Sequence, residues 1–377
     1  MNSKICDLLG IEFPLVAFSH CKDVVAQVSK AGGMGVLGAV GMTPEMLEND
    51  LKWIDENVNG MPYGVDVLIP NKFEGKGESL NPEDWANMIP QEYRDFRADV
   101  LNKHELNGES LREQTTQKSG FGKNLGEDGA QKLLDIAFSH PIKLIANALG
   151  VPPKWMLEMG KKNNVPVAAL VGAKEHAIRQ VQAGVDLLVV SGTEGGGHVG
   201  NVSGLVLVPE IHKAIQPISD IPILAAGGIA TGHQMAGVMA MGASGVWCAS
   251  VFLPTSEAET SPTVKEKMIN ATSSQTVRSR SRTGKHSRQL RSGWTDAWES
   301  KDAPEPLPMP LQTMVGEPAL DIIDKAAENG HQGAKELATY WVGQGIGLVD
   351  ETISAGQTVQ KFKEEFLDAL DRMQSLI

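Results

Sequence analysis

The sequence Gly184-Val-Asp-Leu-Leu-Val-Val-Ser-Gly-Thr-Glu-Gly-Gly-Gly-His-Val-Gly200 joins an apolar strand directly to a loop that contains five glycines, one acid and one histidine. The apolar run is continuous instead of alternating, which is typical of a parallel strand covered on both faces. The same kind of unit recurs along the chain. Candidate strands, all short and mostly apolar, span residues 13–18, 35–39, 63–69, 142–147, 165–170, 185–190, 221–226 and 245–249.

Helical patterns lie between these strands. Thr43, Pro44 and Glu45 have the order of an N-cap, a proline at the first helical position and a first-turn acid. Residues 174–183 form a helical stretch that Gly184 is expected to end. Eight strands alternating with helices predict an α/β fold, namely a (β/α)8 TIM-type barrel, with a doubly wound open sheet as the alternative.

Two segments interrupt this alternation. Residues 70–129 are charged and contain glycines, so we predict an insertion after the third strand, either a lid or a subunit contact. Residues 1–253 then form the barrel, and residues 254–377 form a helical lid or extension that packs on it. The basic run from Arg278 to Arg291 could bind an anion or a nucleotide phosphate, but we predict a solvated loop.

Composition excludes several classes of protein. The formal net charge of −12 disfavours broad nucleic-acid binding, because a polyanion would be repelled over most of the surface. The three cysteines, Cys6, Cys21 and Cys248, are widely spaced, which fits a reducing compartment and predicts neither disulfides nor a metal cluster. Neither a signal peptide nor a membrane span is visible in the sequence, so we expect a soluble, cytoplasmic protein with no membrane partner. A homodimer is left open.

His198 is the main catalytic candidate. In a barrel the carboxyl ends of the strands form the active face, so the loop after the sixth strand would bring His198 and backbone groups into the site. A histidine there can exchange protons near neutral pH. The stretch from Gly195 to Gly200 also matches G-x-G-x-x-G, but a dinucleotide fold normally begins with that turn. The remaining alternative is a glycine-rich connector whose histidine only bonds the backbone.

A second constellation suggests a phosphate site. Gly227 and Gly228 follow the seventh strand, and Ala249 and Ser250 follow the eighth. Barrels often bind phosphate with these two loops, through backbone N–H groups and a helix N-terminus. The alternative is that both are only tight turns between strand and helix. The two loops together favour the phosphate interpretation, and hence a phosphorylated cofactor.

The order of these motifs resembles the nitronate monooxygenase family. The resemblance rests on the His198 loop, on Ala225-Ala-Gly-Gly-Ile229 and on Gly242-Ala-Ser-Gly-Val246. Further matching pieces are Pro14-Leu-Val16, Ala31-Gly-Gly-Met-Gly-Val-Leu-Gly38, Trp294-Thr-Asp-Ala-Trp298 and Gly343-Gln-Gly345. Together they cover nearly the whole chain except the insertion, and their order is much more specific than any single motif.

The resemblance implies an FMN-dependent barrel, and it assigns residues to the cofactor. His198 and Gly196 match the family's glycine-rich loop, whereas Ser191 replaces a glutamine that normally contacts the flavin. Asp66 stands where the family has an asparagine. The other positions that correspond to flavin-contacting segments are Ala17, Phe18 and Ser19 after the first strand, and Trp247, Cys248, Ala249 and Ser250 at the eighth. These departures suggest a divergent subgroup.

The activity that the resemblance implies is the FMN-dependent oxidation of an alkyl nitronate by O2 to a carbonyl compound and nitrite. His198 would serve as base or hydrogen-bond donor. One alternative keeps the fold and uses NAD(P)H to reduce a quinone or an enoyl thioester. A second alternative is a flavin-free barrel that binds a phosphorylated metabolite.

Overall fold

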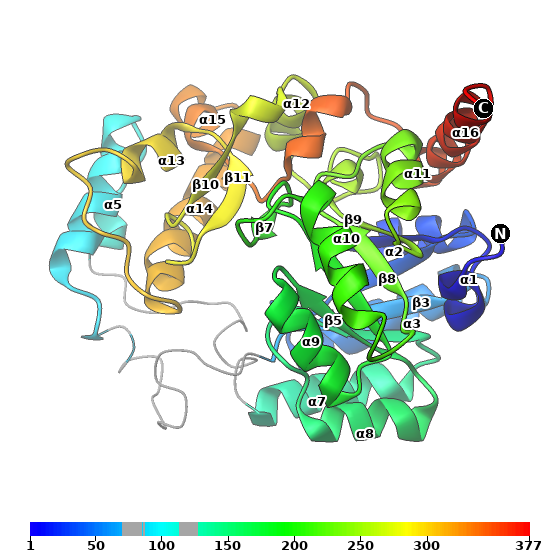
Figure 1. Cartoon of the computed structure of the whole chain (residues 1–377). Helices are drawn as coiled ribbons and strands as arrows, with labels where there is room; N and C mark the ends of the chain where they lie inside the picture. Colours follow the sequence, from blue (N-terminus) through cyan, green and yellow to red (C-terminus); the bar gives the residue numbers. More distant parts are fainter. Residues whose placement is uncertain (70–84, 86, 113–126) are drawn as a thin grey trace.

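Eight parallel strands form a closed barrel, which lies in the right-hand half of the molecule in Figure 1. The computed structural model describes residues 1–69, 85, 87–112 and 127–377. Within this part of the chain β1 pairs with both β2 and β9, which closes the barrel. Its strands are β1 (Leu15–Ser19), β2 (Met34–Gly38), β3 (Tyr63–Val67), β4 (Leu144–Asn147), β5 (Val167–Val171), β6 (Leu187–Ser191), β8 (Ile223–Ala226) and β9 (Gly245–Cys248). The predicted (β/α)8 fold is confirmed, and the open-sheet and dinucleotide-fold alternatives are wrong.

The strand register sorts the side chains into two sets. Each strand sends alternate residues into the barrel and between the barrel and its helices. The inner set contains Val16, Met34, Val36, Leu144, Ala146, Ala168, Leu187, Val189, Leu224 and Trp247. The outer set packs under the helices in two further clusters. Because both sets are apolar, the strands appear as continuous apolar runs in the sequence.

Helices cover the outside of the barrel. They are α2 (Lys22–Lys30), α3 (Pro44–Asn57), α7 (Glu127–Ser139), α8 (Lys154–Asn163), α9 (Lys174–Ala183), α10 (Gly204–Ile215) and α11 (Gly232–Ala240), whereas the buried residues of α1 (Lys4–Leu9) join the inner set. The two predicted helix ends are confirmed. The Thr43 hydroxyl accepts a hydrogen bond from the Met46 N–H and caps α3, and α9 ends at Gly184, whose φ is +92°.

A second hydrophobic core lies beside the barrel. It is built by α5 (Gln91–Lys103), η1 (Glu109–Leu111), α12 (Pro262–Ile269), α13 (Gly293–Trp298), α14 (Leu311–Glu328) and α15 (Gln332–Leu337). Pro318 has no N–H and leaves the Met314 carbonyl of α14 without its helical partner, and Arg97 of α5 donates to that oxygen at 3.3 Å. The segment after the third strand is therefore tied to the C-terminal region. Half of the predicted insertion, residues 70–84, 86 and 113–126, lies outside the described residues.

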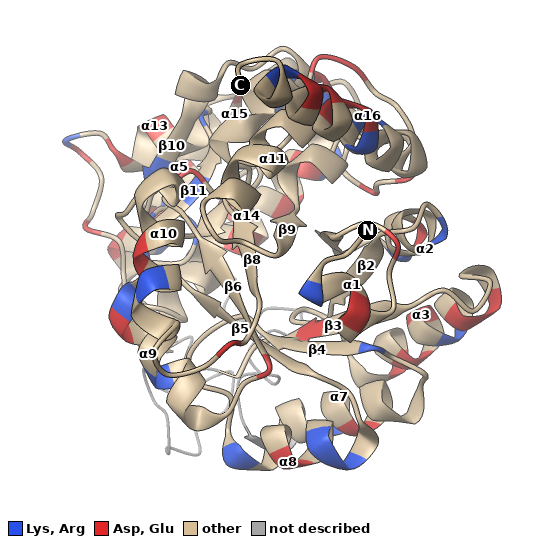
Figure 2. Cartoon of the chain, turned by 45° about the vertical axis from the view of Figure 1, so that its right-hand side comes forward, with Lys and Arg blue, Asp and Glu red and all other residues tan. Residues whose placement is uncertain are grey.

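The C-terminal helix α16 (Ala355–Gln374) does not join this second core. It packs against α2 and α11 on the outside of the barrel. None of the helices in the described ranges is long and apolar enough to cross a membrane. Figure 2 shows both signs of charge on outer helices such as α8, α9 and α16.

The prediction of a solvated loop from Arg278 to Arg291 is wrong. The chain there forms β10 (Thr276–Ser279) and β11 (Ser287–Leu290), an antiparallel pair. Arg282 and Arg288 are only 6% and 7% exposed. Arg282 forms an ion pair with Glu317, and Arg288 donates twice to the Thr193 carbonyl, at 3.0 and 3.1 Å. These partners make burial of two guanidinium groups tolerable.

Candidate functional site

His198 lies in a short strand that the sequence did not reveal. Gly197 and His198 form β7, which pairs antiparallel with β11 at Ser287 and Arg288. The Nε2 atom of His198 lies 2.8 Å from the Thr283 hydroxyl, in the turn between β10 and β11. The imidazole therefore bonds a side chain of the C-terminal region, instead of the backbone as the connector alternative assumed. Figure 1 shows β7 next to this hairpin.

The surroundings of His198 keep its imidazole neutral. Solvent reaches the ring, but protein atoms lie on most sides of it, and this desolvation lowers the pKa of His198 to about 4. The positive charge of Lys285 lowers the pKa further. At neutral pH the ring can therefore accept a proton at one nitrogen and donate a hydrogen bond from the other.

Glycine-rich segments converge next to this histidine. A Cβ on Gly227, where φ is +97°, would lie 2.8 Å from the Gly192 carbonyl oxygen, so the loops after β6 and β8 touch through bare backbone. The turn η4 (Gln344–Leu348) joins them, and the Gln344 N–H donates to the Glu194 carbonyl at 2.8 Å. Ser250, at the start of η2 (Ser250–Phe252), accepts a hydrogen bond from the Gly343 N–H at 2.8 Å.

Four segments that are far apart in sequence thus meet at one end of the barrel. The predicted phosphate-binding residues Gly227, Gly228 and Ser250 are among them, and Ala249 directly precedes Ser250. Gly343 and Gln344 were missed as site residues. The glycines at 343, 345 and 347 mark this segment in the sequence. Only the fold shows that the segment contacts the loop after β6.

The residues predicted to border a flavin ring fall into two groups. The register places Phe18, Asp66, Ser191 and Trp247 on the inner face of the barrel near the carboxyl ends of the strands. Phe18 and Trp247 stack, with ring centroids 6.3 Å apart. Ala17 and Cys248 instead face the helices, so only their backbone atoms could contact a ligand in the barrel. Burial raises the pKa of the Cys248 thiol, which agrees with a buried, inert cysteine.

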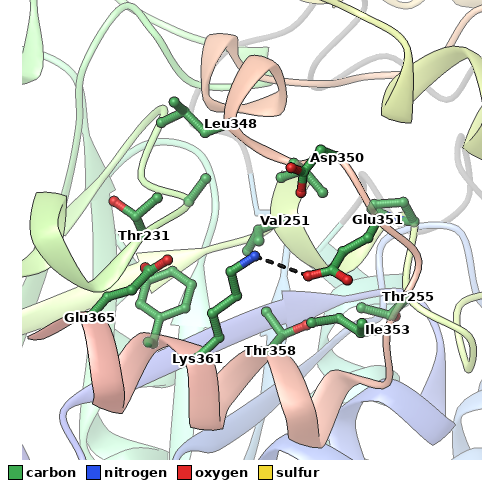
Figure 3. Close-up of a pocket in the computed structure, with 14 residues that line it drawn as sticks. Thr231, Val251, Thr255, Leu348, Asp350, Glu351, Ile353, Thr358, Lys361 and Glu365 are labelled. Atoms are coloured by element: carbon green, nitrogen blue, oxygen red, sulfur yellow. Dashed lines mark hydrogen bonds and ion pairs between the residues drawn. The ribbon is translucent and has the colours of Figure 1, made fainter.

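Two cavities adjoin this region. The larger, of about 270 Å³, lies between the end of β1 and the second core and is lined by Ser19, His20, Cys21, Leu253, Ala258, Glu259, Thr260, Ser261, Val264, Asp324, Glu328 and Tyr340. The smaller, of about 30 Å³, lies behind the phosphate-type turns and is crossed by the Lys361–Glu351 ion pair of 3.1 Å (Figure 3). It holds no more than about two waters. Of these two cavities, the larger has room for a small substrate and the smaller does not.

Cys21, Asp23 and Glu259 have ligand atoms within 4.8 Å of one another beside the larger cavity. Burial raises the pKa of the Cys21 thiol, and its Sγ donates to the Glu257 carbonyl. A metal requires the thiolate, so this group is a poor candidate for a metal site.

The turn that carries Thr283 is held by its neighbour. The Arg282 guanidinium contacts both carboxylate oxygens of Glu317, at 2.7 and 3.2 Å, and lies 4.0 Å from the centroid of the Trp341 ring. Glu317 belongs to α14 and Trp341 to the segment after α15. The position of Thr283, and through it of His198, therefore depends on the second core.

The site thus consists of a histidine and converging glycine-rich loops at the carboxyl ends of the strands of a (β/α)8 barrel. The sequence profile described as nitronate monooxygenase matches residues 2–365. A protein of Mycobacterium tuberculosis named as a candidate monooxygenase, Rv1533, is 48% identical over the full length of both chains. A protein of Staphylococcus saprophyticus named as a probable nitronate monooxygenase is 25% identical over 99% of both chains.

Solved structures share the fold. Nitroalkane oxidase from Streptomyces ansochromogenes has a TM-score of 0.78 and 22% identity, covering 98% of this chain and 99% of the other. FabK from Thermotoga maritima has a TM-score of 0.72 and 23% identity over all of both chains. The chain belongs to the nitronate monooxygenase family, and it is an oxidoreductase of the flavin-dependent kind.

Proposed function

We propose that the chain binds FMN at the carboxyl ends of the barrel strands and oxidises alkyl nitronates with O2. The observation that carries this proposal is the convergence of the His198 loop with three other glycine-rich or serine-bearing segments at one end of the barrel. Family membership supports a flavin, and the site supports the phosphorylated form, FMN.

The residues present fit FMN. Gly227 and Gly228 both have positive φ, and a Cβ would lie 2.8 Å from the Gly192 carbonyl oxygen or the Glu194 Cβ, so both positions require glycine. The main-chain N–H groups of such a turn can bind a phosphate. The Ser250 oxygen accepts from Gly343, which leaves its own proton available to a phosphate oxygen. Phe18, Asp66, Ser191 and Trp247 would border the ring. The chemistry that FMN supplies when bound is electron transfer from the nitronate to O2, giving a carbonyl compound and nitrite.

Charge at the site supports an anionic substrate. Lys285 is exposed and close enough to His198 to lower the pKa of the imidazole. Partial loss of water around the Lys285 ammonium group lowers its pKa, and no carboxylate of the described residues contributes to that pKa. The ammonium group can therefore attract a nitronate. The low pKa makes His198 a weak base, which suits a substrate that arrives deprotonated.

The test is an absorbance spectrum of the purified protein followed by anaerobic titration. Bleaching of a bound flavin by a nitronate, without a response to NAD(P)H, supports the proposal. Rapid bleaching by NAD(P)H instead would establish the reductase alternative, and colourless protein that cannot be reconstituted with FMN would establish the flavin-free one. His198→Asn should keep FMN bound and sharply reduce turnover, so unchanged activity in that variant would remove the role given to His198.

A further inference from the structure

Asp66 is a buried acid without a hydrogen-bond partner in the described part of the chain. It lies in β3, is 1% exposed, and neither of its carboxylate oxygens has a hydrogen-bond partner among the described residues. Its neighbours in register are Gly38 of β2 and Ala146 of β4, which offer no polar side chain. Val65 and Val67 on either side pack under the helices, so the Asp66 side chain faces the barrel interior.

Such a position disfavours the ionised form. A carboxylate that loses water and gains neither a cation nor a hydrogen-bond donor becomes protonated instead. Accordingly, burial raises the pKa of Asp66 well above its usual value. The titratable group that lies against Gly38 is His20, whose Nδ1 bonds the Gly38 carbonyl at 3.0 Å. Burial lowers the pKa of His20, so it provides no compensating cation at neutral pH.

Two other polar residues show that orphaned groups are not general in this barrel. Asn147 in the next strand is fully buried, but its oxygen accepts from the Ile69 N–H and its amide group donates to two carbonyls. Asp55 of α3 accepts from the Tyr63 hydroxyl and contacts the His140 Nδ1, both at 2.6 Å. Asp66 therefore lacks the hydrogen-bond partners that Asn147 and Asp55 have. It lies near the carboxyl ends of the strands, where the ring would bind.

We propose that Asp66 is kept as an un-ionised carboxylic acid whose hydroxyl donates a hydrogen bond to the ring system bound at the barrel mouth. A protonated carboxyl has one donor and one acceptor in nearly the shape of an amide, which explains how an acid can replace the family's asparagine here. The ring identity rests on the proposed function, whereas the protonation of Asp66 does not.

Protonation is tested on the cofactor-free protein by infrared difference spectroscopy between wild type and Asp66→Asn at pH 7. We expect the carbonyl stretch of an un-ionised carboxylic acid in the wild type, and its loss in the variant. A difference spectrum that contains carboxylate bands instead would overturn the inference.

Stability against pH gives a second readout. Asp66 is ionised above about pH 4 in the unfolded chain but stays protonated in the folded chain. The contribution of Asp66 to the free energy of unfolding therefore falls as the pH rises above about 4. Asp66→Asn should therefore raise the melting temperature at pH 8 and leave it nearly unchanged at pH 4. The matched control Asp55→Asn removes a partnered acid and should lower the melting temperature at pH 8. An equal loss of stability in both variants would contradict the assignment.

The donor role is tested by titrating cofactor-free protein with FMN and following quenching of the flavin fluorescence. Asp66→Asn should bind within about threefold of wild type, and Asp66→Leu should bind about tenfold more weakly, as expected for one lost hydrogen bond. Equal affinity of the Leu and Asn variants would overturn the donor role. Failure of the wild type to bind FMN would reject the proposed function while leaving the infrared result valid.

Discussion

The Nε2 atom of His198 lies 2.8 Å from the Thr283 hydroxyl oxygen, and this contact fixes the hydrogen-bonding roles of the imidazole. The same oxygen lies 3.3 Å from the Lys285 carbonyl and 3.4 Å from the Lys285 N–H. All three contacts can be hydrogen bonds only if the hydroxyl donates to the carbonyl and Nε2–H donates to the hydroxyl. Nδ1 is then unprotonated and can only accept, so of the two roles considered for His198 this arrangement favours the base.

Thr283→Val should therefore reduce kcat by about tenfold, because the isosteric side chain removes one hydrogen bond and frees the tautomer. Thr283→Ser retains the hydroxyl and should keep most of the activity. Nitrogen NMR of the imidazole should show Nε2–H in the wild type and a mixture of tautomers in the valine variant. The same tautomer in both proteins would disprove this role for Thr283.

Lys285→Met should raise the KM for a nitronate about tenfold with a smaller effect on kcat, because the variant loses the positive charge that attracts the anion. It should also raise the pKa of His198, since Lys285 lowers it. The acid limb of the kcat profile should therefore move to higher pH. Lys285→Arg serves as the control and should behave like the wild type. A KM that does not respond to the methionine substitution or to added salt would argue against an electrostatic contact.

The contributions of His20 and His198 to folding stability should fall as the pH drops from 7 to 5.5, opposite in direction to the contribution of Asp66. Burial lowers the pKa values of His20 and His198, so the unfolded chain binds more protons than the folded chain below about pH 6.5. Urea unfolding midpoints at several pH values measure this slope. His198→Asn removes one of these contributions, so the stability of the wild type relative to this variant should fall as the pH drops. A difference that stays constant with pH would show that His198 titrates normally in the folded state.

Glu317→Ala should lower the free energy of unfolding by about 3 kcal/mol, because it leaves the Arg282 charge buried without its carboxylate. The exposed pair between Arg280 and Glu305 offers a matched control. Glu305→Ala should cost less than about 1 kcal/mol. Denaturant unfolding measures the free energy of unfolding of both variants. Equal decreases would indicate that the buried ion pair stabilises the fold no more than the exposed one.

Much of the fold could be predicted because its signals are local. Eight apolar runs identified the barrel strands, and the Thr43 cap and the Gly184 stop marked two helices. The hairpin from β10 to β11 was missed because its arginines have the composition of a solvated loop. Their burial depends on Glu317, 35 residues further along the chain, and on the Thr193 carbonyl, 95 residues earlier.

The candidate site was predictable in outline but not in detail. The glycines and His198 that follow the sixth strand lie at the carboxyl ends of the barrel strands, as the sequence predicted. The sequence could not predict that the side chains of Ala17 and Cys248 face the helices. A strand that is apolar on both sides has no alternation of polar and apolar residues to distinguish its two faces. Thr283 carried no signal, since its relevance arises only when β11 pairs with β7.

Because β7 pairs with β11, two parts of the chain together position the imidazole. They meet at the contact between His198 and Thr283, which are 85 residues apart in the sequence. Changes in the C-terminal region can therefore retune the reaction while every barrel strand keeps its sequence. A chimaera that exchanges only the barrel between two members of the family would inherit the histidine without the hairpin that orients it. Successful exchanges should need both segments from the same parent.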